Sequence, residues 1–352
     1  MTATSLIDWD FAVTTGRRLA GTGPKVTPAQ ARDAVRELRD AAARVGAPVA
    51  QTARMHAPAS AEPALVVDRK GWIGANAASM GAMLAPVEER MVALRKPDAP
   101  EPNALVAAGA AKATGAEAGA MLAFLSGKVL GQYDIAPGGT PRLLLVAPNI
   151  VEAERELDVD PHDFRTWVAL HEETHRVQFT AVPWLRDHMI EESRALSVDL
   201  VPDPDQLRAR LTHMARNLPA AFAKGGNGLS DVVTTPEQRA RIADLTAVMS
   251  LLEGHADVVM DDVGPSVVPS VATIRERFTQ RRRGAGSLDV MVRRLLGLEA
   301  KMRQYSEGAT FVRAVVDRVG VDGFNAVWTS PQTLPSADEI AFPQRWVARV
   351  HG

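Results

Sequence analysis

Two histidines four positions apart, His171 and His175, lie in the segment TWVALHEETHRVQF, and Glu172 directly follows the first of them. The apolar residues around them recur at helical spacing, so both histidines continue the stripe that should face the core. Side chains at i and i+4 of a helix lie about 6 Å apart at Cβ, close enough for two imidazoles to bind one ion. Glu172 stands about 100° around the helix from His171, beside the same ion. The spacing predicts the HExxH zinc arrangement, in which the carboxylate takes a proton from water held by the metal.

The residues before this motif specify the start of its helix. Asp160 is placed as the N-cap, Pro161 occupies the first helical position, and Asp163 favours the positive end of the helix dipole. A pair of hydrogen-bonded core histidines is the alternative interpretation of the same pattern. We favour zinc binding, because the motif is helical, faces inward and follows a well-specified cap.

A catalytic zinc site usually has three protein ligands, so a third donor must come from another segment. The candidate is MSLLEGHADVVMDD, in a helix predicted to begin at Pro236 after the N-cap Thr235. We prefer Glu253, at the edge of its apolar stripe, as the third ligand. Asp257, one turn further along the same side, is predicted to accept a hydrogen bond from the N–H of a zinc-bound imidazole. His255 lies about 200° around the helix from Glu253, and His255 or Asp257 as the third ligand is the alternative.

Composition limits the other possibilities. The sequence has no cysteine, which excludes disulfides, thiolate ligands and a cysteine nucleophile, so zinc would be held by nitrogen and oxygen. The 40 basic and 42 acidic residues give a net charge of -2, which offers no global field to attract nucleic acid or an anionic membrane. The N-terminus lacks the pattern of a signal peptide, and no segment is apolar for long enough to span a membrane. We expect a soluble, cytoplasmic protein without nucleic-acid or membrane partners.

Most of the remaining elements are predicted to be helices. Residues 27–46 have Thr27 as the N-cap and Gly46 as the stop signal, and further helices are expected at 76–94 and 104–130. The last of these is rich in alanine and glycine, and its small faces let helices approach closely.

The clearest predicted strand is RLLLVAPNI, residues 142–150, with turn-forming residues on both sides. Few other segments resemble strands, so any sheet should be small. The expected fold class is α+β, predominantly α-helical. A soft boundary at KPDAPEPN divides an N-terminal helical region, residues 1–100, from a metal-binding domain, residues 101–352, and the whole chain could equally form a single domain.

The combination of HExxH with Glu-x-x-x-Asp on a later helix resembles the gluzincins. The chain is similar to zincin-like metallopeptidases common in actinobacteria, and the blocks VDRKGWIGANAASM, GQYDIAP, LEGHAD and LEAKMRQYSEG resemble the branch associated with deazaflavin-coenzyme biosynthesis. This resemblance covers nearly the whole chain and implies a zincin-like core. It also implies His171, His175 and Glu253 as ligands of Zn2+ and Glu172 as the catalytic base.

A zinc hydrolase also needs a hydrogen-bond donor for the oxyanion that develops on the substrate. Tyr305, one of only two tyrosines, extends the buried face of a helix predicted to begin near residue 287. We consider it a candidate oxyanion donor, and the alternative is a core tyrosine with a satisfied hydroxyl.

The function that these residues favour is a zinc-dependent hydrolase, similar to a metallopeptidase, with a peptide or amide substrate. The alternative is a non-catalytic zincin-like binding protein whose metal site is structural or vestigial. A di-iron carboxylate bundle would need a second Glu-x-x-His motif, which we do not find in the sequence.

Overall fold

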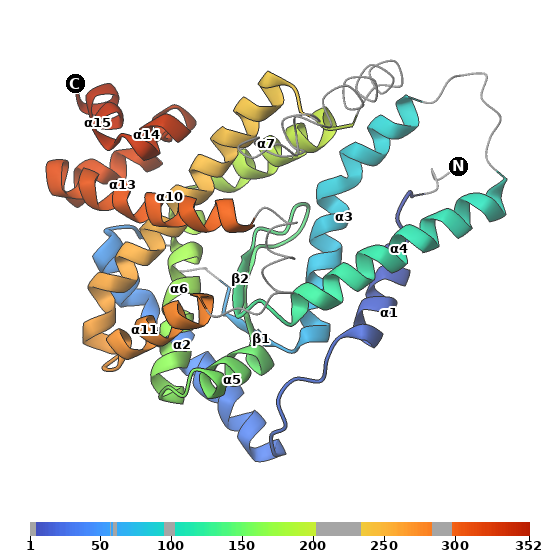
Figure 1. The fold of residues 1–352 in the computed structure, drawn as a ribbon, viewed down its shortest axis with the longest axis horizontal. Coiled ribbons are helices and arrows are strands. Elements are labelled where there is room, and N and C mark those ends of the chain that lie inside the picture. The colour runs from blue at the N-terminus through green and yellow to red at the C-terminus, as the bar shows by residue number, and fades with distance from the viewer. Residues whose placement is uncertain (1–4, 57, 59–61, 95–102, 202–233, 284–297) are drawn as a thin grey trace.

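A small sheet with helices on both faces lies at the centre of the computed structural model (Figure 1). The structure describes residues 5–56, 58, 62–94, 103–201, 234–283 and 298–352, with the side chains of all of these except 281–283 and 298–306. In chain order the elements are α1 (Trp9–Leu19), α2 (Pro28–Ala53), β1 (Leu65–Val67), α3 (Arg69–Ala93), α4 (Ala104–Ser126), β2 (Gly131–Asp134), β3 (Arg142–Val146), α5 (Ala147–Glu156), α6 (Pro161–Ala181), α7 (Leu185–Asp199), α10 (Pro236–Val267), α11 (Val271–Arg283), α13 (Leu298–Phe324), the 3-10 turns η1 (Asn325–Trp328) and η2 (Pro331–Thr333), α14 (Ala337–Ala341) and α15 (Pro343–His351).

The three strands are arranged in the order β1-β3-β2. β1 runs parallel to β3, while β2 pairs antiparallel with β3. The predicted strand at 142–150 is therefore the central strand, but it ends at Val146, and the next residues begin α5. Pro148 explains this correction, because proline lacks the N–H that a central strand donates and suits the first turn of a helix. The prediction of a mainly helical α+β fold with a small sheet is confirmed.

One face of the sheet is covered by α1, α3 and α4, which lie to the right of it in Figure 1. Leu144 and Val146 of β3 pack there with Trp72 and Ile73 of α3 and Leu122 of α4. On this side, α1 crosses α4 at very short range. A Cβ at Gly119 would collide with the carbonyl oxygen of Ala12, and one at Gly115 with that of Asp8. The prediction that small residues here allow close helix packing is confirmed.

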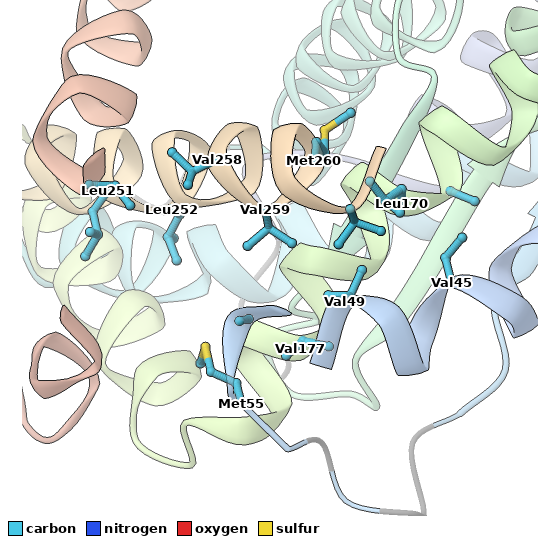
Figure 2. Close-up of a cluster of buried hydrophobic side chains, with 14 of the residues drawn as sticks. Val45, Val49, Met55, Leu170, Val177, Leu251, Leu252, Val258, Val259 and Met260 are labelled. Atoms are coloured by element: carbon cyan, nitrogen blue, oxygen red, sulfur yellow. The ribbon is translucent and has the colours of Figure 1, made fainter. Parts of the chain in front are cut away.

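The opposite face of the sheet packs on the larger core, which α2, α6 and α10 build together (Figure 2). Its residues are almost completely excluded from water, including Val45 and Val49 of α2, Leu170 of α6 and Leu252 of α10. These side chains bring segments that are far apart in the sequence into one contiguous cluster.

The helix predicted for residues 27–46 has the expected N-cap, with a complete capping box between Thr27 and Gln30. Its predicted stop at Gly46 is wrong, because α2 continues to Ala53. A glycine inside a helix costs only about 1 kcal/mol, less than the burial of Val49 and Ala53 beyond it contributes. Gly46 instead meets Glu173 of α6, whose Oε1 would lie 3.1 Å from an added Cβ.

Residues before position 100 take part in both layers of the structure. β1 pairs with β3, and α2 packs against α6 and α10. The division into regions 1–100 and 101–352 stays a prediction, and most of the predicted boundary segment, residues 96–103, lies outside the described residues. None of the described helices has the length and apolar character that crossing a bilayer requires.

The close crossing of α1 and α4 gives a direct test of the fold. Gly119→Ala should lower the free energy of unfolding by about 1–3 kcal/mol, because the new methyl group meets backbone atoms rather than a flexible side chain. Gly109→Ala, on the same helix, is the matched control: nothing lies within 4 Å of its added Cβ. The control should raise stability by up to about 1 kcal/mol. Urea unfolding measures both, and equal effects would contradict the packing described.

Candidate metal centre

Three potential metal ligands converge between α6 and α10. His171 and His175 come from α6 and Glu253 from α10, and one donor atom of each lies within 4.8 Å of the others. The two Nε2 atoms are 3.2 Å apart. The carboxylate oxygens of Glu253 lie 3.6 Å from Nε2 of His171 and 3.8 Å from Nε2 of His175. All three side chains are partly accessible to solvent, with exposures of 26%, 13% and 26% in chain order.

The local sequence explains why these helices present the three groups to one point. Asp160 caps α6 by accepting from the N–H of Asp163, and Thr235 caps α10 through a capping box with Gln238, both as predicted. The apolar faces of α6 and α10 then pack on each other in the core of Figure 2. Leu170, beside His171, and Leu252, beside Glu253, belong to this core, so the neighbouring polar groups emerge at its edge.

A second helix, α13, supports α10 directly behind the third ligand. A Cβ at Gly254 would collide with the backbone of Gly308, and one at Gly308 would collide with the carbonyl of Ser250. The two helices therefore meet backbone to backbone one residue after Glu253. This contact fixes the turn of α10 that carries the carboxylate.

The donor set fits zinc. Two imidazole nitrogens and one carboxylate oxygen are typical of a catalytic zinc site, which keeps the fourth position for water. Ligand distances of about 2.0–2.1 Å in a tetrahedron separate the donors by roughly 3.3 Å. The two Nε2 atoms are 3.2 Å apart, and the distances to Glu253 are 3.6 Å from His171 to Oε2 and 3.8 Å from His175 to Oε1.

Glu172 lies beside this centre but is deeply buried, with 7% of its surface exposed. Burial raises the pKa of its carboxyl group well above the ordinary value, and the negative charge of Glu253 acts in the same direction. Gly131, the first residue of β2, lies directly against it: an added Cβ would be 2.7 Å from the Glu172 Oε1. The strand beside Glu172 is therefore the outer strand β2, whereas the predicted strand β3 is central in the sheet.

Gln178 orients one of the imidazoles, a contact that the sequence did not reveal. Its Oε1 lies 3.0 Å from Nδ1 of His175, while its Nε2 donates to the backbone oxygen of Leu252 at 2.9 Å. The other imidazole has its Nδ1 3.2 Å from the sulfur of Met260. A signal for Gln178 does exist in the sequence, since it is a polar residue on the buried stripe three positions after His175.

His255, an alternative third ligand in the sequence analysis, is placed outside the cluster of three. Its ring is 3% exposed, stacks on Phe324 at 5.4 Å, and directs Nδ1 to Nε2 of Gln178 at 2.9 Å. Burial lowers its pKa to about 3, with a smaller contribution from His175, so the ring is neutral at physiological pH. Among the described residues, Glu253 is the acid that joins the two histidines.

The other two predicted residues stay predictions. Asp257 lies partly buried one turn beyond Glu253, and its backbone oxygen accepts from Arg275. The side chain of Tyr305 lies outside the described residues. Its position in α13 is one turn before Gly308, where that helix crosses α10.

Comparison with known proteins agrees with this geometry. A family model described as zincin-like metallopeptidase matches residues 7–347. The chain belongs to the zincin-like metallopeptidase family. A solved crystal structure from Chloroflexus aurantiacus, described provisionally as a hydrolase with a novel fold, is 31% identical to this zincin-like chain. The match covers 98% of this chain and 99% of the other with a TM-score of 0.66. No curated protein matches the chain.

The centre predicts one equivalent of bound zinc. His175→Ala and Glu253→Ala should each abolish stoichiometric binding, because two remaining donors hold the ion weakly. Zinc at 100 times its dissociation constant should stabilise the wild-type protein by about 2.7 kcal/mol, and a chelator should reverse the gain. His162→Ala, an exposed histidine on the same helix, is the control and should bind zinc normally. Elemental analysis and thermal unfolding measure both effects; full zinc occupancy in Glu253→Ala would refute the assignment of that ligand.

Proposed function

We propose that this protein is a zinc-dependent hydrolase that cleaves a peptide or related amide bond. The observation that carries the proposal is the convergence of His171, His175 and Glu253 beside the buried carboxylate of Glu172. Bound zinc would supply a Lewis acid and lower the pKa of a coordinated water. Membership in a family of zincin-like metallopeptidases supports the same reaction class.

In this mechanism Glu172 moves the proton. It takes a proton from the attacking water and delivers it to the leaving nitrogen, as a general base and then a general acid. Glu172 directly follows the proposed ligand His171 in the sequence, and its carboxylate is shielded from bulk water. The proton therefore passes within a site of low polarity. Gly131 leaves the room that this carboxylate occupies.

The outer strand β2 is our candidate for binding the substrate. It pairs with β3 on one side, and Gly131 at its start contacts Glu172. An extended peptide that adds to the other edge of β2 would pass beside the general base, and its main chain would supply the hydrogen bonds. Tyr305 as the oxyanion donor and Asp257 as the acceptor for a ligand imidazole belong to the same proposal.

A non-catalytic binding role is the second candidate, and one observation favours it. A hollow of about 840 Å³ lies between α3 and the β2–β3 hairpin, and the three potential metal ligands are not among its lining residues. Catalysis by Glu172 distinguishes the two roles. The cytoplasmic location stays a prediction from the N-terminal pattern and the lack of long apolar segments. The actinobacterial branch and the association with deazaflavin-coenzyme biosynthesis stay predictions of the sequence resemblance.

Glu172→Gln should keep zinc and lower turnover of a peptide library by at least about 10²–10⁴-fold, the usual contribution of a general acid or base. Glu173→Gln is the matched control, because this neighbouring carboxylate is 1% exposed and pairs with Arg176 at 2.6 Å. It should lower stability and leave turnover per folded molecule unchanged. If the wild-type protein binds zinc and cleaves no peptide, or if Glu172→Gln is fully active, the catalytic proposal is wrong.

Gly131→Ala tests the contact between β2 and the general base. The new methyl group must displace the Glu172 carboxylate, so the turnover number should fall while zinc content stays at one equivalent. Gly139→Ala serves as the control, because the nearest atom lies an ordinary 3.7 Å from its added Cβ. Steady-state kinetics on metal-loaded protein separate the two variants; equal turnover numbers would contradict the proposed role of Gly131.

A further inference from the structure

Gln178 is a completely buried amide at the contact between α6 and α10. It makes three polar contacts. Its Oε1 faces Nδ1 of His175 at 3.0 Å, and its Nε2 faces the backbone oxygen of Leu252 at 2.9 Å and Nδ1 of His255 at 2.9 Å. Two of these partners belong to the metal centre or adjoin it: His175 is a predicted ligand, and Leu252 directly precedes another, Glu253.

These contacts determine the direction of every hydrogen bond. A backbone oxygen only accepts, so the nitrogen of the Gln178 amide must face Leu252. The amide oxygen then faces His175, whose Nδ1 must carry the proton and donate. His255 accepts through Nδ1 and carries its own proton on Nε2. In this tautomer His175 presents the lone pair of Nε2, the atom that lies nearest His171 and Glu253.

We propose that Gln178 is a positioning residue of the metal centre. It selects the tautomer of His175 that binds a metal through Nε2, and it ties α6 to the residue of α10 that precedes Glu253. One side chain thus sets the distance between donors that come from two helices. This inference rests on the proposed zinc site, whose ligands are His171, His175 and Glu253.

His255 holds Gln178 from the other side. Its ring stacks on Phe324 at 5.4 Å and meets Trp328 edge-on at 5.5 Å. The indole N–H of Trp184, just after α6, donates to the backbone oxygen of Trp328. The end of α13 and the turn η1 therefore hold the ring of His255, whose Nδ1 contacts the Gln178 amide.

A purely structural role would have a different signature. A buried, satisfied amide stabilises the fold wherever it lies, and its removal lowers the free energy of unfolding. Zinc affinity is the quantity that separates positioning from stability. Loss of an outer hydrogen-bond partner of a metal ligand typically weakens metal binding by about 10–100-fold.

The test compares three variants by chelator competition for zinc and by urea unfolding of the metal-free protein. Gln178→Leu should bind zinc about 10–100-fold more weakly. Gln178→Glu keeps an acceptor for Nδ1 of His175 but loses the donor to the Leu252 oxygen. Its zinc affinity should therefore lie between those of the wild-type protein and Gln178→Leu. The control Gln238→Leu removes another buried glutamine, which caps the start of α10, and should lower stability with unchanged affinity.

The outcomes separate this inference from the proposed function. If the wild-type protein binds no zinc, both fail. If it binds zinc and Gln178→Leu binds it equally tightly, the positioning role alone is overturned. Should Gln178→Leu not fold, NMR of histidine rings in the zinc-loaded wild-type protein decides: we expect a slowly exchanging proton on Nδ1 of His175, hydrogen-bonded to Gln178. Metal binding through Nδ1 of His175 would refute the proposal.

Discussion

The packing of α6 on α10 is the constraint on which the rest of the site depends. Two histidines on one helix are placed by helical geometry alone, but the third donor comes from a distant part of the chain. Its distance from them is fixed by contacts across the fold, above all by apolar side chains of the two helices such as Leu170 and Leu252. Interiors pack at the density of organic crystals, so the helices meet in one register. The polar groups at the edge of this core are therefore held at defined distances from one another.

Backbone contacts through glycine refine the arrangement at two places. Gly308 lets α13 lie directly on α10 beside Glu253, and Gly131 lets β2 lie against the carboxylate of Glu172. Both positions need the absence of a side chain rather than any special backbone angle. The site is therefore bounded by a helix beside Glu253 and by a strand beside Glu172, and a hydrogen-bonded amide, Gln178, connects its two helices.

Local signals in the sequence predicted the parts of this architecture that depend on local physics. The caps at Asp160 and Thr235 form as expected, because each cap involves residues three positions apart. The grouping of Glu253 with the histidines agrees with the preferred choice from the sequence, which rested on the edge of its apolar stripe and on the resemblance to the gluzincins. Contacts across the fold decided the rest: α2 runs through Gly46 because its far end is buried, and the role of Gln178 depends on a carbonyl of another helix. A sequence specifies such contacts only through the completed structure.

X-ray absorption at the zinc K edge of the purified protein tests the central claim most directly. We expect one zinc per chain with only nitrogen and oxygen neighbours at about 2.0–2.1 Å, and outer-shell scattering from two imidazole rings. Replacing Glu253 with glutamine should change the oxygen contribution and leave both imidazoles in place. A spectrum with a single imidazole, or one that substitution of Glu253 leaves unaltered, would contradict the assembly of one metal centre from α6 and α10.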